Sequence, residues 1–201
     1  MENTKTREPQ QKRSIEKKNR IIEVGFHLMC KHGYQKTTTA DIAKAAGVST
    51  GIIYNYFKDK RDIFICGLQE YGNQMMSLVY EEITPNIDIR SSIETLIDAI
   101  ANSHYIFQFG HQEIEALTMM DNEIATIMHE NELRITTHLE SVITGAGFES
   151  TNLSEKTHII YNMVESYCHE LIFHHHTSLD YTKMRELVID SILFLLGPQN
   201  K

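Results

Sequence analysis

The segment from residue 37 to residue 60 concentrates hydroxyl, tyrosine and lysine side chains of the kind that contact nucleic acids. Hydroxyl groups hydrogen-bond to phosphate oxygens or base edges, lysine ammonium groups neutralise phosphates, and a glycine lets the backbone approach closely. The residues that would share one surface are Ser49, Thr50, Gly51, Ile52, Tyr54, Asn55 and Tyr56, with Lys58 and Lys60 at its rim. This surface forms only if the surrounding sequence folds into two short helices.

The local sequence predicts such a pair of helices, joined by a glycine turn. Thr38 is a good N-cap, and with Asp41 it resembles a capping box in which Asp replaces the usual Glu. Ala43 is small where a second helix must cross closely, and Gly47 follows four residues later. This spacing is typical of a helix-turn-helix, whose second helix lies in the major groove of DNA. The alternative is an unrelated helical hairpin with a polar surface.

Charge is distributed unevenly along the 201 residues, which carry a net charge of -8. Residues 1–60 carry +6 and residues 61–201 carry -14. A basic end on an acidic body suggests that one end meets a polyanion. Residues 1–10 are polar and expected to be disordered. The basic side chains of the N-terminal segment either reach phosphates or a minor groove or stay solvated: Lys5, Arg7, Lys12, Arg13, Lys17, Lys18 and Arg20.

Apolar residues recur at helical spacing along most of the chain, and no stretch shows sustained strand alternation. The sequence therefore predicts an all-α fold. The expected domains are a disordered basic arm at residues 1–10, a three-helix DNA-binding domain with the helix-turn-helix at 11–60, and a helical regulatory domain for ligand binding and dimerisation at 61–201. The first helix is expected from about Gln11 to His32.

Several classes of protein are excluded or disfavoured by the sequence. No apolar run reaches the ~20 residues of a membrane span, and the N-terminus lacks the apolar region of a signal peptide. The scattered cysteines Cys30, Cys66 and Cys168 fit a reducing cytoplasm. The chain lacks a nucleophile elbow, a phosphate loop, a zinc-protease motif and a dinucleotide fingerprint, so we do not expect an enzyme. A protein-binding adaptor without DNA binding is the other rival.

These motifs together resemble the TetR family of bacterial transcriptional regulators. The resemblance covers roughly residues 18–64, about a quarter of the chain, and the length and helical remainder agree with the family. Its residues are Gly33-Tyr34, Thr37-Thr38-Thr39, Ile42-Ala43, Ala46-Gly47-Val48-Ser49 and Tyr54-Asn55-Tyr56-Phe57-Lys58-Asp59-Lys60.

The resemblance implies a homodimer with two recognition helices on a near-palindromic operator in double-stranded DNA. Matched by position, Thr39 and Lys60 contact phosphates, Thr50 and Gly51 lie at the front of the recognition helix, and Tyr54 and Tyr56 are aromatic contacts. The recognition helix contains no Arg for a bidentate guanine contact, so specificity must come from other side chains or DNA shape. The predicted DNA-binding residues are Thr38, Thr39, Lys44, Ser49, Thr50, Gly51, Tyr54, Asn55, Tyr56, Lys58 and Lys60.

The resemblance also implies a ligand pocket within residues 61–201 and a dimer interface on the last two helices. Soft and aromatic residues favour a small, largely apolar effector that releases a repressor, although each of them is also a candidate core residue. The pocket candidates are Tyr71, Met75, His104, Phe107, Met119, Met120, Met128 and Tyr161. The interface candidates are Val164, Cys168, Ile172, Leu187, Val188, Ile192 and Leu195. No resident cofactor is predicted.

Histidines gather in the acidic part of the chain, which holds nine of the eleven. Imidazole is a common metal ligand, and Glu165 and His169 lie one helical turn apart, so a metal- or haem-sensing repressor is the alternative function. Consecutive residues such as His174, His175 and His176 point around a helix instead of converging, and histidine also suits a solvated helix end. We therefore assign no metal ligands.

Overall fold

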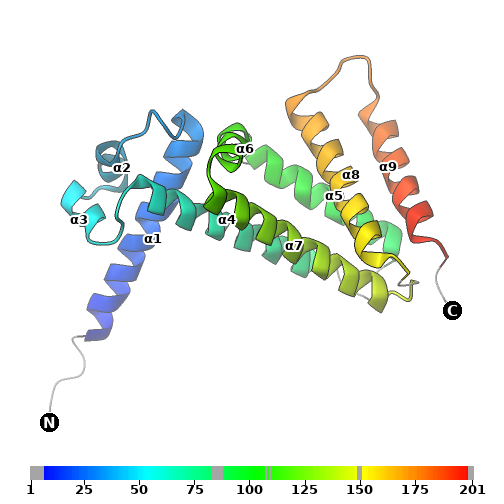
Figure 1. Cartoon of the computed structure of the whole chain (residues 1–201), viewed down its shortest axis with the longest axis horizontal. Helices are drawn as coiled ribbons and strands as arrows, with labels where there is room; N and C mark the ends of the chain where they lie inside the picture. Colours follow the sequence, from blue (N-terminus) through cyan, green and yellow to red (C-terminus); the bar gives the residue numbers. More distant parts are fainter. Residues whose placement is uncertain (1–6, 83–87, 107, 109, 149–150, 199–201) are drawn as a thin grey trace, which may run out of the picture. The chain divides into compact units, whose positions relative to one another are not determined.

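In the computed structural model of the chain, residues 7–82, 88–106, 108, 110–148 and 151–198 are described, and they form nine α-helices and no β-strand (Figure 1). The helices are α1 (Arg7–His32), α2 (Thr39–Ala46), α3 (Thr50–Tyr54), α4 (Lys60–Glu82), α5 (Ile89–Ile106), α6 (His111–Met120), α7 (Asn122–Gly145), α8 (Leu153–Phe173) and α9 (Tyr181–Leu196). The predicted all-α fold is confirmed. No helix within the described ranges is both long and apolar enough to cross a membrane.

The helices group into two compact units. The first contains residues 1–71 and 109–124, and the second contains residues 72–108 and 125–201. This division differs from the predicted boundary after residue 60, because α4 runs unbroken from Lys60 to Glu82 and the first unit also takes α6. A carboxylate oxygen of Glu113 on α6 accepts a hydrogen bond of 3.0 Å from the backbone N–H of Tyr34, which ties α6 into this unit.

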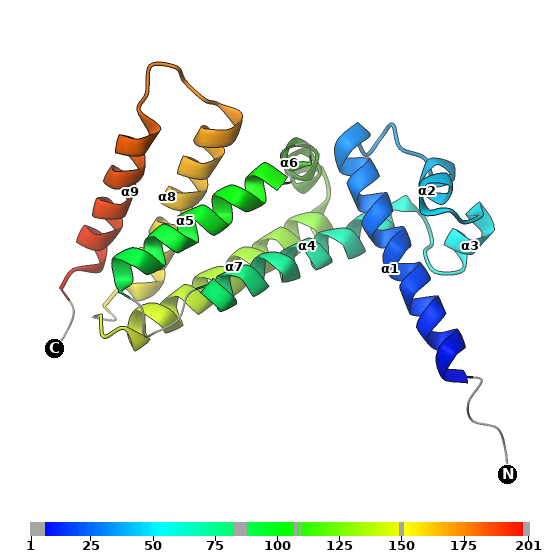
Figure 2. The same ribbon diagram turned by 180° about the vertical axis from the view of Figure 1, so that it is seen from behind.

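The first unit packs α1, α2, α3 and the start of α4 around an apolar core. Figure 2 shows the ribbon of these helices from behind. Phe26 on α1 and Phe64 on α4 lie with their ring centroids 5.2 Å apart. Gly67, one turn beyond Phe64, has no room for a side chain because a Cβ there would overlap Phe26. The other buried apolar residues of these helices and their loops are Ile21, Met29, Cys30, Ile42, Ala43, Ala46, Ile53, Phe57, Ile63, Ile65 and Leu68.

Helix α1 begins at Arg7, earlier than the start predicted near Gln11. Residues 7–10 thus lie in this helix, where the sequence predicted disorder, while residues 1–6 lie outside the described part of the chain. Pro9 falls in the first turn of the helix, where a backbone N–H has no intrahelical acceptor, so its missing donor costs nothing there.

The second unit packs α5 against α8 and α9. Its core includes Val164, Cys168 and Ile192, which are 0%, 0% and 1% exposed. The thiol of Cys168 lies 3.7 Å from the carbonyl oxygen of Ile97 on α5, in hydrogen-bonding contact. Because the same chain covers these side chains, Val164, Cys168 and Ile192 are core residues and offer no surface to a second copy, which corrects that part of the predicted dimer interface.

Candidate nucleic-acid interface

The turn between α2 and α3 follows the predicted helix-turn-helix chemistry. The backbone N–H of Asp41 donates to Thr38 Oγ1 at 3.2 Å, and the N–H of Thr38 donates back to the Asp41 carboxylate at 2.9 Å. The hydrogen bonds from Thr38 hold the pKa of Asp41 below its usual value. Gly47 ends α2 at φ 71°, a left-handed conformation that suits glycine, and redirects the chain into α3. The capping box and the turn are confirmed.

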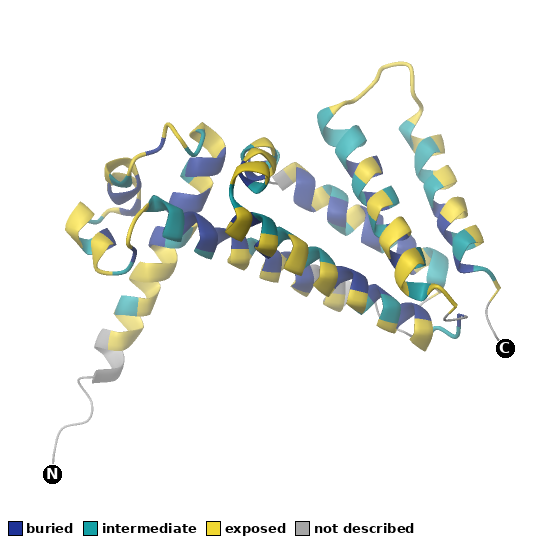
Figure 3. Cartoon of the chain, in the orientation of Figure 1, coloured by how far each residue is buried: buried dark blue, intermediate teal, exposed yellow. Residues whose placement is uncertain are grey.

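Helix α3 turns one residue inward and most of the others outward. Ile53 is completely buried, whereas Ser49, Thr50, Gly51 and Tyr54 are exposed (Figure 3). Ser49 is the N-cap residue, but its hydroxyl accepts no capping hydrogen bond, so it remains available to an external partner. The buried residue fixes which face of α3 is presented, and that face carries the predicted hydroxyl and aromatic contacts.

Asn55, Lys44 and Lys58 are exposed as well. Lys44 projects from α2, and Lys58 follows α3 in the loop to α4. Thr38 is exposed and serves as the α2 cap, while Thr39 is half-buried at the first position of α2. These residues therefore form a largely exposed polar surface on α2, α3 and the following loop, as the sequence predicts.

Tyr56 differs from Tyr54, because its hydroxyl already has a partner within the chain. It shares a hydrogen bond of 2.8 Å with the hydroxyl of Ser14 on α1, and the residue is half-buried. Tyr56 thus fastens the end of the recognition segment to α1 while leaving part of its ring at the surface. Sequence reasoning placed Tyr56 on the groove side and gave no signal for this contact, which joins residues 42 positions apart.

Lys60 also has a structural role that the sequence did not reveal. Its ammonium donates to the carbonyl oxygens of Tyr34 at 2.6 Å and Thr37 at 2.9 Å, and lies 4.4 Å from the centroid of the Tyr34 ring. These contacts hold the loop between α1 and α2 against the start of α4. Only one of the three ammonium N–H groups remains for the phosphate contact that the family resemblance implies.

Arg61 joins the start of α4 to the junction between α6 and α7. Its guanidinium donates to both carboxylate oxygens of Asp121, at 2.7 and 2.8 Å, and lies 2.8 Å from the Glu123 carboxylate. The hydrogen bond from Arg61 lowers the pKa of Asp121 to about 2. Asp121 also accepts hydrogen bonds from the backbone of Glu123 and Ile124 at the start of α7, the capping role that its sequence position suggests. The ion pair itself has no local sequence signal.

The predicted pocket residues do not share one environment. Met119 and Met120 are 83% and 79% exposed, because α6 turns Ile114 and Leu117 inward, so neither methionine lies in a buried pocket. The remaining candidates stay predictions: Met75 and His104 are buried, Tyr71, Met128 and Tyr161 are half-buried, and Phe107 lies outside the described residues.

His104 is a buried polar residue within the second unit. One ring nitrogen lies 3.2 Å from the Glu165 carboxylate on α8, and the other lies 3.0 Å from the carbonyl oxygen of Ile100. Burial opposes the imidazolium form, but the hydrogen bond and the charge of Glu165 outweigh it and raise the pKa of His104. The contact therefore joins α5 to α8 most strongly when the imidazole is protonated.

The outer side of α8 and α9 is apolar and open. A groove of about 570 Å³ on the second unit is lined by Ile159, Asn162, Met163, Ser166, Tyr167, Glu170, Met184 and Val188. Leu187 and Phe194 on α9 are 66% and 89% exposed. Of the predicted interface residues, Leu187 is exposed, and Ile172, Val188 and Leu195 are half-buried. Sequence periodicity missed Ile159 and Phe194, because it does not show which apolar face the chain itself covers.

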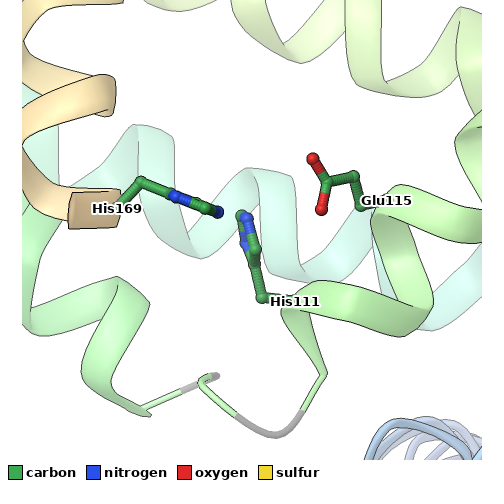
Figure 4. Close-up of side chains that lie close together, drawn as sticks. All are labelled: His111, Glu115 and His169. Carbon is green, nitrogen blue, oxygen red and sulfur yellow. The ribbon is translucent and has the colours of Figure 1, made fainter. Parts of the chain in front are cut away.

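Most of the candidate metal-binding histidines contact carboxylates or aromatic rings. His176 lies 3.1 Å from Glu170, and His175 stacks on Tyr181 at 4.4 Å between centroids. Figure 4 shows His111 and Glu115, which are spaced one turn apart on α6, together with His169 from α8 of the second unit. A zinc site needs three or four protein ligands, and α6 offers only these two. The two residues of the first unit therefore do not form a zinc site by themselves.

Comparison with known proteins identifies the segment that carries this surface. Residues 21–65 match the model of the bacterial regulatory proteins, tetR family. This segment belongs to the TetR family. It is 34% identical over 90 residues to the HTH-type transcriptional regulator AcrR of Shigella flexneri, covering 44% of this chain and 42% of the relative. It is 25% identical over 125 residues to the fatty acid metabolism regulator protein of Bacillus subtilis, covering 62% and 59%.

These relatives are transcriptional regulators and not enzymes, and the chain spans about two to three fifths of their lengths. Solved structures extend the likeness along the chain. A structure assigned to the TetR family from Mesorhizobium loti has a TM-score of 0.77 at 16% identity, covering 92% of this chain and 96% of that one. The fatty acid degradation regulator FadR from Bacillus halodurans has a TM-score of 0.67 at 21% identity, covering 90% and 95%. At these identities the likeness shows the fold alone.

Proposed function

We propose that the protein is a transcriptional repressor that binds a near-palindromic DNA operator as a homodimer and is released by a small, largely apolar effector. The main support for DNA binding is the orientation of α3, which follows a glycine turn. Ile53 is buried, whereas Ser49, Thr50 and Tyr54 are exposed. In a helix-turn-helix this face enters the major groove.

The chemistry of the exposed surface supports binding that combines charge with shape and hydroxyl contacts. Lys44 and Lys58 add sequence-independent attraction to phosphates. Thr50 and Tyr54 provide hydroxyls for base edges or the sugar–phosphate backbone, and Gly51 permits close approach. Since the recognition helix has no Arg, a sequence preference depends on these contacts and on the deformability of the site.

The open apolar side of α8 and α9 supports the homodimer. Ile159, Leu187 and Phe194 expose apolar surface there, and an apolar patch of this kind is stabilised when a second copy covers it. A two-fold dimer would also explain a near-palindromic operator, because each copy presents one α3 to one half-site. Binding over a promoter then blocks polymerase without further protein contacts.

The effector class rests on the second unit and on two relatives. Within the second unit, buried Met75 and half-buried Met128 and Tyr161 are soft or aromatic, and His104 and Glu165 form a polar pair. The names of the Bacillus subtilis relative and the Bacillus halodurans structure connect those proteins with fatty acid metabolism. An apolar molecule with one polar end fits both observations.

The experiment compares Tyr54→Ala with a matched control, Tyr105→Ala, which removes an exposed tyrosine from α5. Fluorescence anisotropy measures affinity for a duplex taken from the region upstream of the protein's own coding sequence and for a random duplex. We expect Tyr54→Ala to abolish the preference for the upstream duplex and Tyr105→Ala to retain it. Equal affinity of the Tyr54→Ala variant and the unaltered protein for the upstream duplex would remove α3 from the interface.

A further inference from the structure

Helix α1 extends well beyond the core that it helps to build. The helix starts at Arg7, yet among the side chains described from residue 11 onward its first buried residue is Ile21, which is also where the match to the family model begins. Residues 7–20 alone span about 20 Å at 1.5 Å per residue. Figure 3 shows this extension almost entirely exposed where its side chains are described, and Ser14 is its single half-buried residue there.

The extension carries a stripe of positive charge. Arg13, Lys17 and Arg20 are spaced i, i+4 and i+7, which places them along one face of the helix. Within residues 11–20, Lys12 and Lys18 add further positive charge, and Glu16 is the one acidic residue. Among the described residues, none of the three stripe side chains takes part in an ion pair.

Such a stripe is unfavourable in isolation. Like charges three or four positions apart destabilise a helix, and a solvated helix of this length has little packing to offset the cost. An anionic partner along the stripe would reverse the sign of the electrostatic contribution. A regular row of phosphates is the partner that matches a row of cations.

The extension is also held beside the recognition segment. Ser14 on α1 shares its hydrogen bond with Tyr56, just after α3, and the Lys18 ammonium lies 5.8 Å from the centroid of the Phe57 ring. Ser14 and Lys18, which make these contacts, lie on the same side of α1 as the buried Ile21. Arg13 and Lys17 lie about 100° around the helix from Ser14 and Lys18 respectively. The charged stripe therefore borders the segment that follows α3 and faces solvent.

We infer that Arg13, Lys17 and Arg20 bind backbone phosphates of the duplex beside the half-site that α3 occupies. This inference rests on the proposed function and adds to it a second, sequence-independent contact outside the segment that the family model covers. The three side chains hold the first unit on DNA and set part of the salt dependence of its DNA affinity, while α3 supplies the sequence preference.

The test replaces the three cations by glutamine, which keeps side-chain length and helix propensity: Arg13→Gln, Lys17→Gln and Arg20→Gln together. Its control removes the same charge elsewhere through Lys31→Gln, Lys156→Gln and Lys183→Gln. Affinity for a random duplex and for the upstream duplex is measured against salt concentration. Circular dichroism establishes that both triple variants keep the helical content of the unaltered protein.

We expect the stripe variant to lower the slope of log affinity against log salt by about 2.7 for each subunit bound, at about 0.9 per phosphate contact, and so by about 5.4 for the proposed dimer. The dimer's loss of affinity between 50 and 200 mM salt would then be roughly 2,000-fold smaller than that of the unaltered protein. The change should be equal on both duplexes, because phosphates carry no sequence, and the control variant should keep the original slope.

The outcomes separate this inference from the function on which it rests. If the stripe variant keeps the original slope while the unaltered protein still prefers the upstream duplex, the inference is overturned and the proposed function stands. If the unaltered protein binds neither duplex, both are overturned. If the stripe variant instead changes the oligomeric state without changing the slope, the stripe binds the acidic part of a second copy, which also overturns the inference.

Discussion

Replacing Lys60 should destabilise the first unit even in the absence of DNA. Lys60→Met removes the ammonium but keeps an unbranched apolar stem beside Tyr34. It leaves the carbonyl oxygens of Tyr34 and Thr37 without their donor, and Thr37 is 3% exposed, so water reaches its carbonyl poorly. Lys58→Met is the matched control, since Lys58 is exposed and only its backbone N–H is hydrogen-bonded, to Asp62.

The magnitude follows from the two hydrogen bonds. A charge-assisted hydrogen bond contributes about 1.5–3 kcal/mol, and the cation over the Tyr34 ring adds roughly 0.5–1 kcal/mol. Because Lys60 is half-buried, solvent replaces part of both contributions, which leaves a net loss of about 2 kcal/mol on Lys60→Met. With a urea dependence of about 2 kcal/mol per molar, the midpoint should fall by about 1 M.

Urea unfolding of the full chain, followed by circular dichroism, measures this loss, and amide hydrogen exchange of residues 34–37 localises it. We expect Lys60→Met to speed exchange in that loop and Lys58→Met to leave the midpoint within about 0.2 M of the original, as for most exposed positions. If Lys60→Met keeps the original midpoint but loses DNA affinity as Lys58→Met does, then Lys60 contacts DNA phosphate and does not stabilise the loop.

Three further predictions address packing, pH and assembly. Gly67→Ala places a Cβ against Phe26 and should cost about 1–3 kcal/mol in urea unfolding; full stability of the variant would show that α1 and α4 pack less closely. The pKa of Asp121 is depressed to about 2, so its contribution to stability is present above its ordinary pKa of 3.8 and is lost as pH falls toward 2; Asp121→Asn should flatten the acid limb of the urea midpoint against pH, and an unaltered limb would contradict the ion pair with Arg61. Phe194→Glu should leave the fold intact, since the side chain is 89% exposed, but weaken self-association in light scattering, whereas a variant that remains as dimeric as the original would exclude this part of α9 from the interface.

The helix-turn-helix was predictable because its determinants are local. Thr38 and Asp41 are three residues apart, Gly47 ends α2 at a conformation that suits glycine, and Ile53 follows the helical period. Each of these residues acts through neighbours in sequence, so propensity, capping and periodicity agree.

The contacts that brace this surface were not predictable for the opposite reason. Lys60 reaches carbonyls 23 and 26 residues away, Arg61 reaches Asp121 60 residues away, and Ser14 meets Tyr56 across 42 residues. A long cationic side chain has many possible partners, and only the folded backbone selects one. The family resemblance therefore implied a phosphate contact for Lys60 and no part in holding the loop.

The regulatory part shows a second limit of periodicity. Helices α8 and α9 each carry apolar residues on more than one side, so spacing alone did not distinguish the buried Val164, Cys168 and Ile192 from the exposed Leu187 and Phe194. In α6 the same ambiguity placed the exposed Met119 and Met120 among the pocket residues. Burial in the folded chain resolves both cases.

Selection of bound sequences from a random double-stranded library shows whether the protein binds DNA through α3 as a two-fold dimer. If the protein presents two α3 helices from a two-fold dimer, the selected sequences should converge on an inverted repeat whose half-sites are centred about one helical turn, roughly 34–36 Å, or a multiple of it, apart. Selection with Tyr54→Ala should lose the consensus while retaining salt-sensitive binding. A consensus without two-fold symmetry, or none at all for the unaltered protein, would contradict the account.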